Sequence, residues 1–202
     1  MTGLIKPESG EVIGPDGNKI ALFSPSAFIE TGLGNIPEDR NKMGLVGDMT
    51  IAENLVLKQT NSERFSAGHG AWLKLDAINE YAEQLKDEND IRCTSVNQTA
   101  RSLSGGNQQK VIFGRWILTQ PDVLLLDEPT RGIDVGAKYE IYQLIQDLAK
   151  QGKAVVMVSS EMPELLGVCN RIVVMSGGRV AGEVDADNTT QEEIMTLAAK
   201  YA

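Results

Sequence analysis

Two stretches decide the fold: Leu103-Ser104-Gly105-Gly106-Asn107-Gln108-Gln109-Lys110, and the later run Val123-Leu124-Leu125-Leu126-Asp127-Glu128-Pro129-Thr130. The first predicts a helix start that Ser104 can cap, with two glycines that let the backbone approach a phosphate closely. The second predicts a strand buried on both faces, as in a parallel α/β sheet, that ends in two carboxylates. A helix start suits an anion, and paired carboxylates suit Mg²⁺ and a water, so together they indicate nucleotide phosphate chemistry.

Bulk composition narrows the possible classes of function. The 202 residues suffice for one sizeable core, and the net charge of −9 argues against a nucleic-acid surface. No apolar run approaches the roughly 20 residues that span a bilayer, and no signal peptide is visible at the N-terminus. Cys93 and Cys169 lack metal-site spacing and indicate reduced thiols, while a single histidine excludes a His-rich metal site.

The motifs resemble those of the nucleotide-binding domain of an ABC transporter. LSGGNQQK is similar to the ABC signature, and VLLLDEPT is similar to the Walker B strand with its catalytic glutamate. The runs GNQQK, PTRGIDVGAK and VSSEMPELL resemble the second ATP-binding domain of carbohydrate-uptake importers of the ribose, galactose and xylose type. The resemblance covers nearly the whole chain. It implies an α/β, P-loop NTPase-like ATPase core with a mostly parallel sheet and an inserted helical subdomain, lacking its first strands.

The resemblance also implies a role for each motif residue. Asp127 would hold Mg²⁺ through water, and Glu128 would polarise the attacking water as general base. The signature residues would face an ATP bound by a second domain, and they are Ser104, Gly105, Gly106, Asn107 and Gln108.

Three further positions fall in nucleotide-contacting loops of the family. Glu38 stands where the Q-loop has its glutamine, although a solvated turn explains the same residues. Asp134 belongs to the D-loop. Ser160 stands where most members have a histidine, and this departure argues against efficient ATP hydrolysis at the domain's own site.

The phosphate-binding motif GxxxxGK[ST] does not occur in the 202 residues. In the family it would lie just before Gly3, so the chain resembles a fragment that starts after this loop. Because backbone N–H groups and a lysine of that loop normally cradle the β- and γ-phosphates, we expect weak ATP binding by the chain itself. Its signature would still complete the ATP site of a partner.

Four segments are predicted along the chain. Residues 1–37 form the β-rich part of the ATPase core, and residues 38–104 form the helical subdomain. Residues 105–187 return to the core with the signature helix, Walker B, D-loop and switch region. Residues 188–202 form a C-terminal helix.

Periodicity and turn signals predict the individual elements. Strands are expected at 10–13 and 20–23, and Thr50 with Glu53 predicts a capping box. One helix is expected over 76–88, anchored by Trp72 and Leu73, and another over 136–150. A buried strand over 154–158, a hairpin between 171 and 184, and a helix opened by a capping box at Thr190 complete the chain.

The predicted function is that of an ATP-binding and ATP-hydrolysing part of an importer for sugars, with ATP and Mg²⁺ as cofactors. Expected partners are an integral-membrane permease, a second nucleotide-binding domain and, indirectly, a periplasmic or extracellular solute-binding protein, with no nucleic acid. The expected location is the cytoplasmic face of the membrane. A non-catalytic fragment that docks on a permease or partner ATPase remains an alternative, as do nucleosides as solutes. An ABC ATPase of DNA repair or translation is disfavoured, because neither long heptads nor basic tracts occur.

Overall fold

The computed structural model describes residues 3–20, 23–68 and 70–202. They form two compact units, one up to Val156 and the other from Met157 onward, and each unit is described by itself. The predicted strand over 20–23 lies partly outside the described residues, and His69 lies outside them. The four predicted segments stay a prediction.

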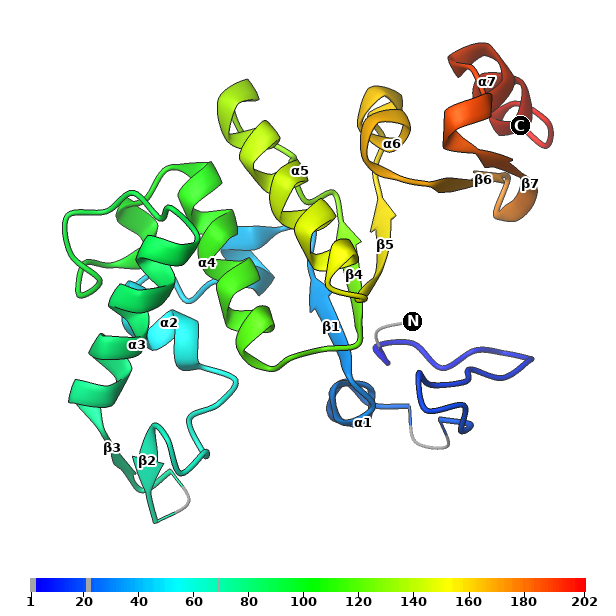
Figure 1. Cartoon of the computed structure of the whole chain (residues 1–202). Coiled ribbons are helices and arrows are strands. Elements are labelled where there is room, and N and C mark those ends of the chain that lie inside the picture. Colours follow the sequence, from blue (N-terminus) through cyan, green and yellow to red (C-terminus); the bar gives the residue numbers. More distant parts are fainter. Residues whose placement is uncertain (1–2, 21–22, 69) are drawn as a thin grey trace. The chain divides into compact units, whose positions relative to one another are not determined.

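A three-stranded sheet forms the centre of the first unit (Figure 1). Its strands are β1 (Leu33–Ile36), β4 (Val123–Asp127) and β5 (Ala154–Val158), in the order β1-β4-β5, and the last two residues of β5 belong to the second unit. β1 runs parallel to β4, with Ile36 opposite Leu126. Leu124, Leu125 and Leu126 are all buried, so both faces of β4 are covered, as its apolar run predicts.

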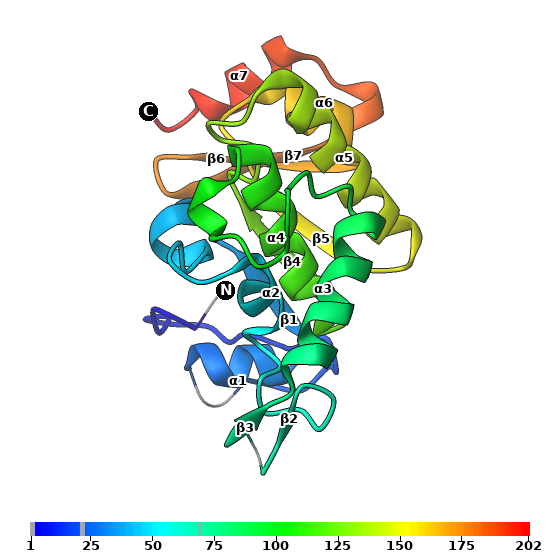
Figure 2. The ribbon, with the colours of Figure 1, turned by 90° about the vertical axis from the view of Figure 1, so that its left-hand side faces the viewer.

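The signature helix α4 (Gly105–Leu118) packs against β1, against α5 (Val135–Lys150) and against α2 (Ile51–Val56). α2 and α3 (Leu75–Glu88) form a helical arm on the side of α4 away from the sheet (Figure 1), and the turned view brings this arm forward (Figure 2). The predicted capping box at the start of α2 is confirmed. α3 buries the predicted apolar stripe, which consists of Ile78, Tyr81, Ala82 and Leu85.

Shorter elements complete the first unit. α1 (Pro25–Glu30) begins after Ser24, η1 (Arg40–Gly44) is a π-helical turn, and η2 (Ala100–Ser102) is a 3₁₀ turn. β2 (Ser66–Ala67) pairs with β3 (Trp72–Leu73) in an antiparallel hairpin. The strand expected at 10–13 is reduced to one antiparallel bridge between Ile13 and Lys19.

The second unit contains α6 (Met162–Val168), β6 (Arg171–Ser176), β7 (Arg179–Asp185), η3 (Ala186–Asn188) and α7 (Gln191–Ala198). β6 and β7 form the predicted antiparallel hairpin, and Ile172 and Val174 pack with Ile194 of α7. Thr190 accepts a hydrogen bond from the Glu193 N–H, but the Glu193 carboxylate binds the Thr189 hydroxyl, so the second bond of the predicted capping box is not made there.

Two predictions about burial are wrong. Trp72 and Leu73 do not anchor α3, since they lie on the short β3 with 76% and 46% of their surface exposed. The strand over 154–158 forms, but its Val156 and Val158 are 40% and 56% exposed. The exposed positions alternate with the half-buried Val155 and Met157, so one face of β5 is open to solvent. In residues 3–20, 23–68 and 70–202, none of the helices has both the length and the apolarity that a membrane crossing demands.

Candidate functional site

The helix α4 begins after the exposed Ser104. Ser104 occupies the N-cap position with an extended backbone, as predicted, but its hydroxyl does not cap the helix. Its Oγ instead accepts a hydrogen bond of 2.9 Å from Asn107 Nδ2. Because the first N–H groups of a helix have no intrahelical acceptor, they stay available to an anion or to water at this end.

The two glycines of the signature make close contacts inside the chain. A Cβ on Gly106 would lie 2.4 Å from the Ala137 Cβ of α5, and a Cβ on Gly105 would lie 2.8 Å from Arg40 Nη2. Any larger residue would push α4 away from these neighbours. The packing of α4 therefore requires glycine here, besides the close approach to a phosphate that the sequence suggests.

The carboxamides of Asn107 and Gln108 are engaged by neighbours. Asn107 Oδ1 accepts a 2.8 Å hydrogen bond from the Arg92 N–H, so Asn107 joins the loop before α4 to the helix start. The buried Gln108 accepts from Arg40 Nε at 3.2 Å and donates to the Ala100 carbonyl at 3.4 Å. These contacts position the helix start, and direct contact of either side chain with ATP stays a prediction.

Two carboxylate-bearing loops leave the same edge of the sheet. Because Ile36 lies opposite Leu126 in parallel strands, Glu38 and Asp127 follow the carboxyl ends of adjacent strands. The crevice outside these ends is where open α/β sheets bind ligands. Asp127 is exposed, and Glu128 has a φ of +45°, a left-handed conformation that is costly for a side chain other than glycine and occurs preferentially at functional sites.

These residues fit a magnesium ion that is shared with phosphates. The described part of the chain has no cluster of three or more His, Cys, Asp or Glu residues that could enclose a metal. Mg²⁺ does not need such a cage, since it commonly binds one or two carboxylates, water and substrate phosphates. The exposed Asp127 at the end of β4 supplies an oxygen ligand of that kind.

Arg40 joins these loops to the signature helix. Its Nη1 donates to the Arg131 carbonyl at 2.7 Å and its Nη2 donates to the Gly132 carbonyl at 3.2 Å, while Nε bonds Gln108. The Arg131 N–H in turn donates to the Glu128 carbonyl at 3.1 Å, and the Arg131 guanidinium pairs with the Glu38 carboxylate. One side chain thus connects the loop after β1, the loop after β4 and the start of α4.

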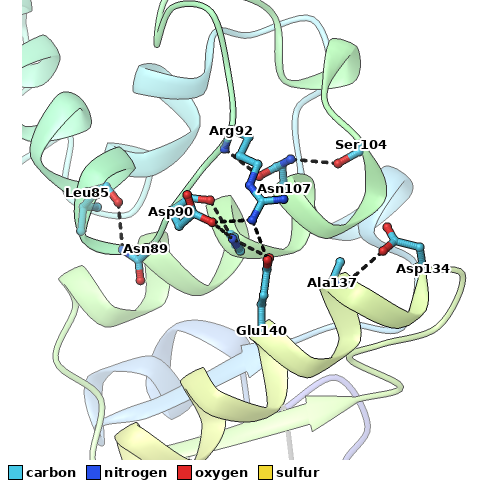
Figure 3. Close-up of polar contacts among 10 residues, drawn as sticks. Leu85, Asn89, Asp90, Arg92, Ser104, Asn107, Asp134, Ala137 and Glu140 are labelled. Carbon is cyan, nitrogen blue, oxygen red and sulfur yellow. Dashed lines mark hydrogen bonds and ion pairs between the residues drawn. The ribbon is translucent and has the colours of Figure 1, made fainter.

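Asp134 and Ser160 have different surroundings. Asp134 is the N-cap of α5, and its Oδ1 accepts a 3.0 Å hydrogen bond from the Ala137 N–H (Figure 3). This role is structural and leaves a contact with nucleotide as a prediction. Ser160 lies in the second unit, between β5 and α6, and its contact with a nucleotide stays a prediction.

A cluster of four charged residues ties the arm, α4 and α5 together (Figure 3). Lys110 Nζ, on a side chain that is 6% exposed, lies 2.8 Å from Glu140 Oε2 and donates to the Asp90 carbonyl at 2.7 Å. Arg92 Nη2 lies 2.9 Å from Asp90 Oδ2 and 2.8 Å from Glu140 Oε1. The hydrogen bond from Arg92, followed by the charge of Lys110, lowers the pKa of Asp90.

Sequence reasoning missed Arg40 and this cluster. The only signal for Arg40 is its position two residues after Glu38, and its partners lie 68 to 92 residues away in sequence. Lys110 belongs to the signature motif, which does not indicate its ion pair with Glu140. Charged residues are common on solvated faces, so no pattern in one sequence singled these out.

A helix N-terminus beside the carboxyl edge of a parallel sheet defines a class of protein, an α/β domain suited to nucleotide phosphates. The family described as ABC transporter matches residues 1–131, and the chain belongs to this family. The expected recognition and fold class are thereby confirmed.

Relatives with curated functions match almost the entire chain. It is 48% identical over 201 residues to the galactose/methyl galactoside import ATP-binding protein of Clostridium perfringens strain 13, covering 100% of this chain and 38% of that protein. It is 46% identical over 198 residues to the ribose import ATP-binding protein of Corynebacterium glutamicum, covering 98% of this chain and 37% of that protein. The chain therefore spans less than two fifths of the length of these relatives.

Solved ABC cassettes share the fold. The post-hydrolysis dimer of the ATP-binding cassette MJ0796, bound to ADP and Pi, aligns with a TM-score of 0.73 at 25% identity, covering 92% of this chain and 77% of that one. The cassette MJ1267 aligns with a TM-score of 0.78 at 21% identity, covering 98% and 80%. The second likeness shows the fold alone.

Proposed function

We propose that the chain is part of an ATP-binding and ATP-hydrolysing component of an importer for sugars or related small solutes. The observation that carries this proposal is the 48% identity, over the full chain, to a galactose/methyl galactoside import ATP-binding protein. The geometry supports it, because the start of α4 and the Asp127-Glu128 loop are joined through Arg40 in an ABC cassette fold.

In the proposed mechanism the residues act in two ATP sites. Asp127 would hold Mg²⁺, which would neutralise phosphate charge, and Glu128 orients and polarises the attacking water. The N–H groups at the start of α4, with Ser104, Gly105 and Gly106, stabilise phosphate charge on an ATP bound by a second nucleotide-binding domain. Glu38, Asp134 and Ser160 contribute from the adjoining loops. Attachment to a permease at the cytoplasmic face of the membrane belongs to the same proposal.

The test measures ATP hydrolysis and ATP-driven solute uptake in proteoliposomes that hold the permease and the polypeptide carrying this chain. Replacing Glu128 with Gln is expected to reduce hydrolysis by roughly 10²–10⁴-fold, the usual contribution of a general base, while ATP binding persists. Glu80→Gln, which alters an exposed glutamate on α3 outside the proposed site, is the matched control. Unchanged hydrolysis in Glu128→Gln would contradict the assigned role.

The solute is tested in the same vesicles with galactose, ribose and a nucleoside. The names of the relatives support a sugar. ATP-driven uptake of the nucleoside alone would favour the second class of solute. If the chain attaches to the permease but neither uptake nor hydrolysis depends on Glu128 and Ser104, the chain is a non-catalytic docking fragment.

A further inference from the structure

The orientation of the Asn107 carboxamide is fixed by a backbone group. Asn107 Oδ1 accepts a 2.8 Å hydrogen bond from the Arg92 N–H. A backbone N–H can only donate, so the carboxamide oxygen must face Arg92 and the carboxamide nitrogen must face away from it. That nitrogen lies 2.9 Å from Ser104 Oγ and donates to it (Figure 3). The two hydrogen bonds together exclude the flipped carboxamide.

This arrangement determines what the Ser104 hydroxyl can do. A hydroxyl has one O–H donor and two acceptor lone pairs. Among the described residues, Ser104 Oγ accepts the bond from Asn107, and its O–H donates to no protein group. Because Asn107 Nδ2 occupies one lone pair, the hydroxyl proton cannot lie between the two atoms. The exposed Ser104 therefore keeps its proton for an acceptor outside the chain.

The cluster of four charged residues holds Arg92 in place for this bond. Arg92 Nη2 lies 2.9 Å from Asp90 Oδ2 and 2.8 Å from Glu140 Oε1 of α5. The buried Lys110 of α4 lies 2.8 Å from the same Glu140 carboxylate and donates to the Asp90 carbonyl at 2.7 Å. Single exposed ion pairs contribute little, whereas a network with a buried member restrains all of its side chains. The Arg92 N–H is thereby kept beside Asn107 at the start of α4.

We infer that Asn107 is a positioning residue for Ser104. It keeps the Ser104 hydroxyl as a donor, whose proton is then offered to a phosphate oxygen of the ATP bound by a second nucleotide-binding domain. Donation from Asn107 also polarises the O–H bond and strengthens its hydrogen bond to an anionic oxygen. The inference rests on the proposed function, because that function brings a phosphate to the start of α4.

Asn107→Asp tests the direction of donation with almost no change in shape. A carboxylate still accepts from the Arg92 N–H but cannot donate, so the Ser104 hydroxyl turns and donates to it. In proteoliposomes with the permease and the polypeptide carrying this chain, KM for ATP should rise about tenfold or more, the loss of one hydrogen bond to a charged group. kcat should stay within about threefold, since binding lost equally from substrate and transition state raises KM alone. Equilibrium binding of a non-hydrolysable ATP analogue should weaken by the same factor as KM rises.

A double-mutant cycle separates positioning from a direct effect of residue 107 on ATP. In a Ser104→Ala background there is no hydroxyl to turn, so adding Asn107→Asp should raise KM by less than about threefold. Effects that multiply would mean that residue 107 contacts or repels the nucleotide directly. Asn97→Asp is the matched control and should leave KM unchanged. It adds the same charge to an exposed asparagine in the loop before α4 and keeps the backbone bond to Ser95 Oγ.

The two hydrogen bonds of Asn107 are tested without ATP in the 202-residue chain. Nuclear magnetic resonance spectra of the isotope-labelled chain report the carboxamide protons of Asn107 and the amide proton of Arg92. Ser104→Ala should shift one Asn107 carboxamide proton and leave the Arg92 amide proton in place. Asn107→Leu should move the Arg92 amide proton to the position of a solvent-bonded amide, whereas Asn107→Asp should keep it hydrogen-bonded, because a carboxylate oxygen still accepts there.

The inference is overturned if Ser104→Ala leaves the Asn107 carboxamide protons unshifted, because the two side chains are then not bonded. It is also overturned if Asn107→Asp leaves KM unchanged, or if the effects in the cycle multiply. When Glu128→Gln still suppresses hydrolysis, each of these results leaves the proposed ATPase function standing. Unchanged hydrolysis in Glu128→Gln instead contradicts the proposed function, and the role of Asn107 toward ATP is rejected with it.

Discussion

Arg40 is the side chain on which the geometry of the candidate site depends most. Its three hydrogen bonds reach the carbonyls of Arg131 and Gly132 and the side chain of Gln108. Arg40→Met removes all three and leaves the buried Gln108 with one partner fewer. Hydrogen bonds to a charged donor contribute 1.5–3 kcal/mol each when buried, so we expect a total loss of about 1–3 kcal/mol at this half-buried position.

Urea unfolding measures this loss, and Arg101→Met is the control. Arg101 pairs with Asp48 through side chains that are 64% and 80% exposed, and such a pair contributes at most about 1 kcal/mol. Equal effects of the two substitutions would mean that Arg40 does not hold the three segments together.

Asp90 gives a prediction about pH. The hydrogen bond from Arg92 and the charge of Lys110 lower its pKa, so the folded protein favours the ionised form. Asp90→Asn keeps the left-handed backbone at φ +47°, which Asn tolerates, and removes the charge. The variant should be less stable than the parent above about pH 3.9, the ordinary aspartate pKa. The difference should vanish as pH falls through the lower folded pKa.

Thermal unfolding between pH 3 and pH 7 tests this dependence. The parent chain and Asp90→Asn should approach the same melting temperature at the acidic end and separate toward neutral pH. Asp187→Asn is the control, because Asp187 uses its backbone N–H to bond Asp185 and the substitution keeps that bond. A constant difference over the whole range would refute the electrostatic explanation.

The contact between α4 and α5 is the element on which the signature depends. Gly106→Ala would place a methyl group 2.4 Å from the Ala137 Cβ, and overpacking of this kind costs about 1–3 kcal/mol. Gly136→Ala on α5 meets only Asp134 Oδ1 at 3.5 Å, an ordinary contact. It should be neutral or stabilising, because alanine favours helix over glycine by up to about 1 kcal/mol. Chemical denaturation should order the variants as Gly136→Ala, parent, Gly106→Ala, and the reverse order would contradict this packing argument.

Local sequence signals predicted most helices and strands, whereas contacts between residues distant in the sequence were not predicted. The stripe of α3, the run of β4 and the capping box at Thr50 follow from spacing within one segment, and all are confirmed. The exposure of β5 depends on what covers each of its faces, which is a property of the fold and not of the segment.

The same distinction applies within the candidate site. Ser104 was correctly placed at the start of α4, yet its hydroxyl binds Asn107 in place of the backbone. A serine at this position can bond either the helix backbone or a nearby side chain, and the local sequence pattern is compatible with both. Arg40 could not be found, because its acceptors come from two other loops that only the folded chain brings near.

At the scale of the molecule, the residues of the candidate site are unequally distributed between two ATP sites. The start of α4 would serve a phosphate bound by a second domain, whereas Asp127 and Glu128 would serve one bound beside β4.

The last prediction concerns ATP binding by the 202-residue chain itself. The phosphate cradle GxxxxGK[ST] is absent from this sequence, and each charge-assisted hydrogen bond of such a cradle contributes on the order of 1.5–3 kcal/mol. Loss of three such bonds weakens binding by roughly 10³-fold or more. Calorimetry with ATP and Mg²⁺ should detect no binding at micromolar concentrations. A polypeptide that places such a loop ahead of residue 3 should bind. Micromolar binding by the 202 residues alone would mean that other groups, such as the start of α4, hold the phosphates within one chain.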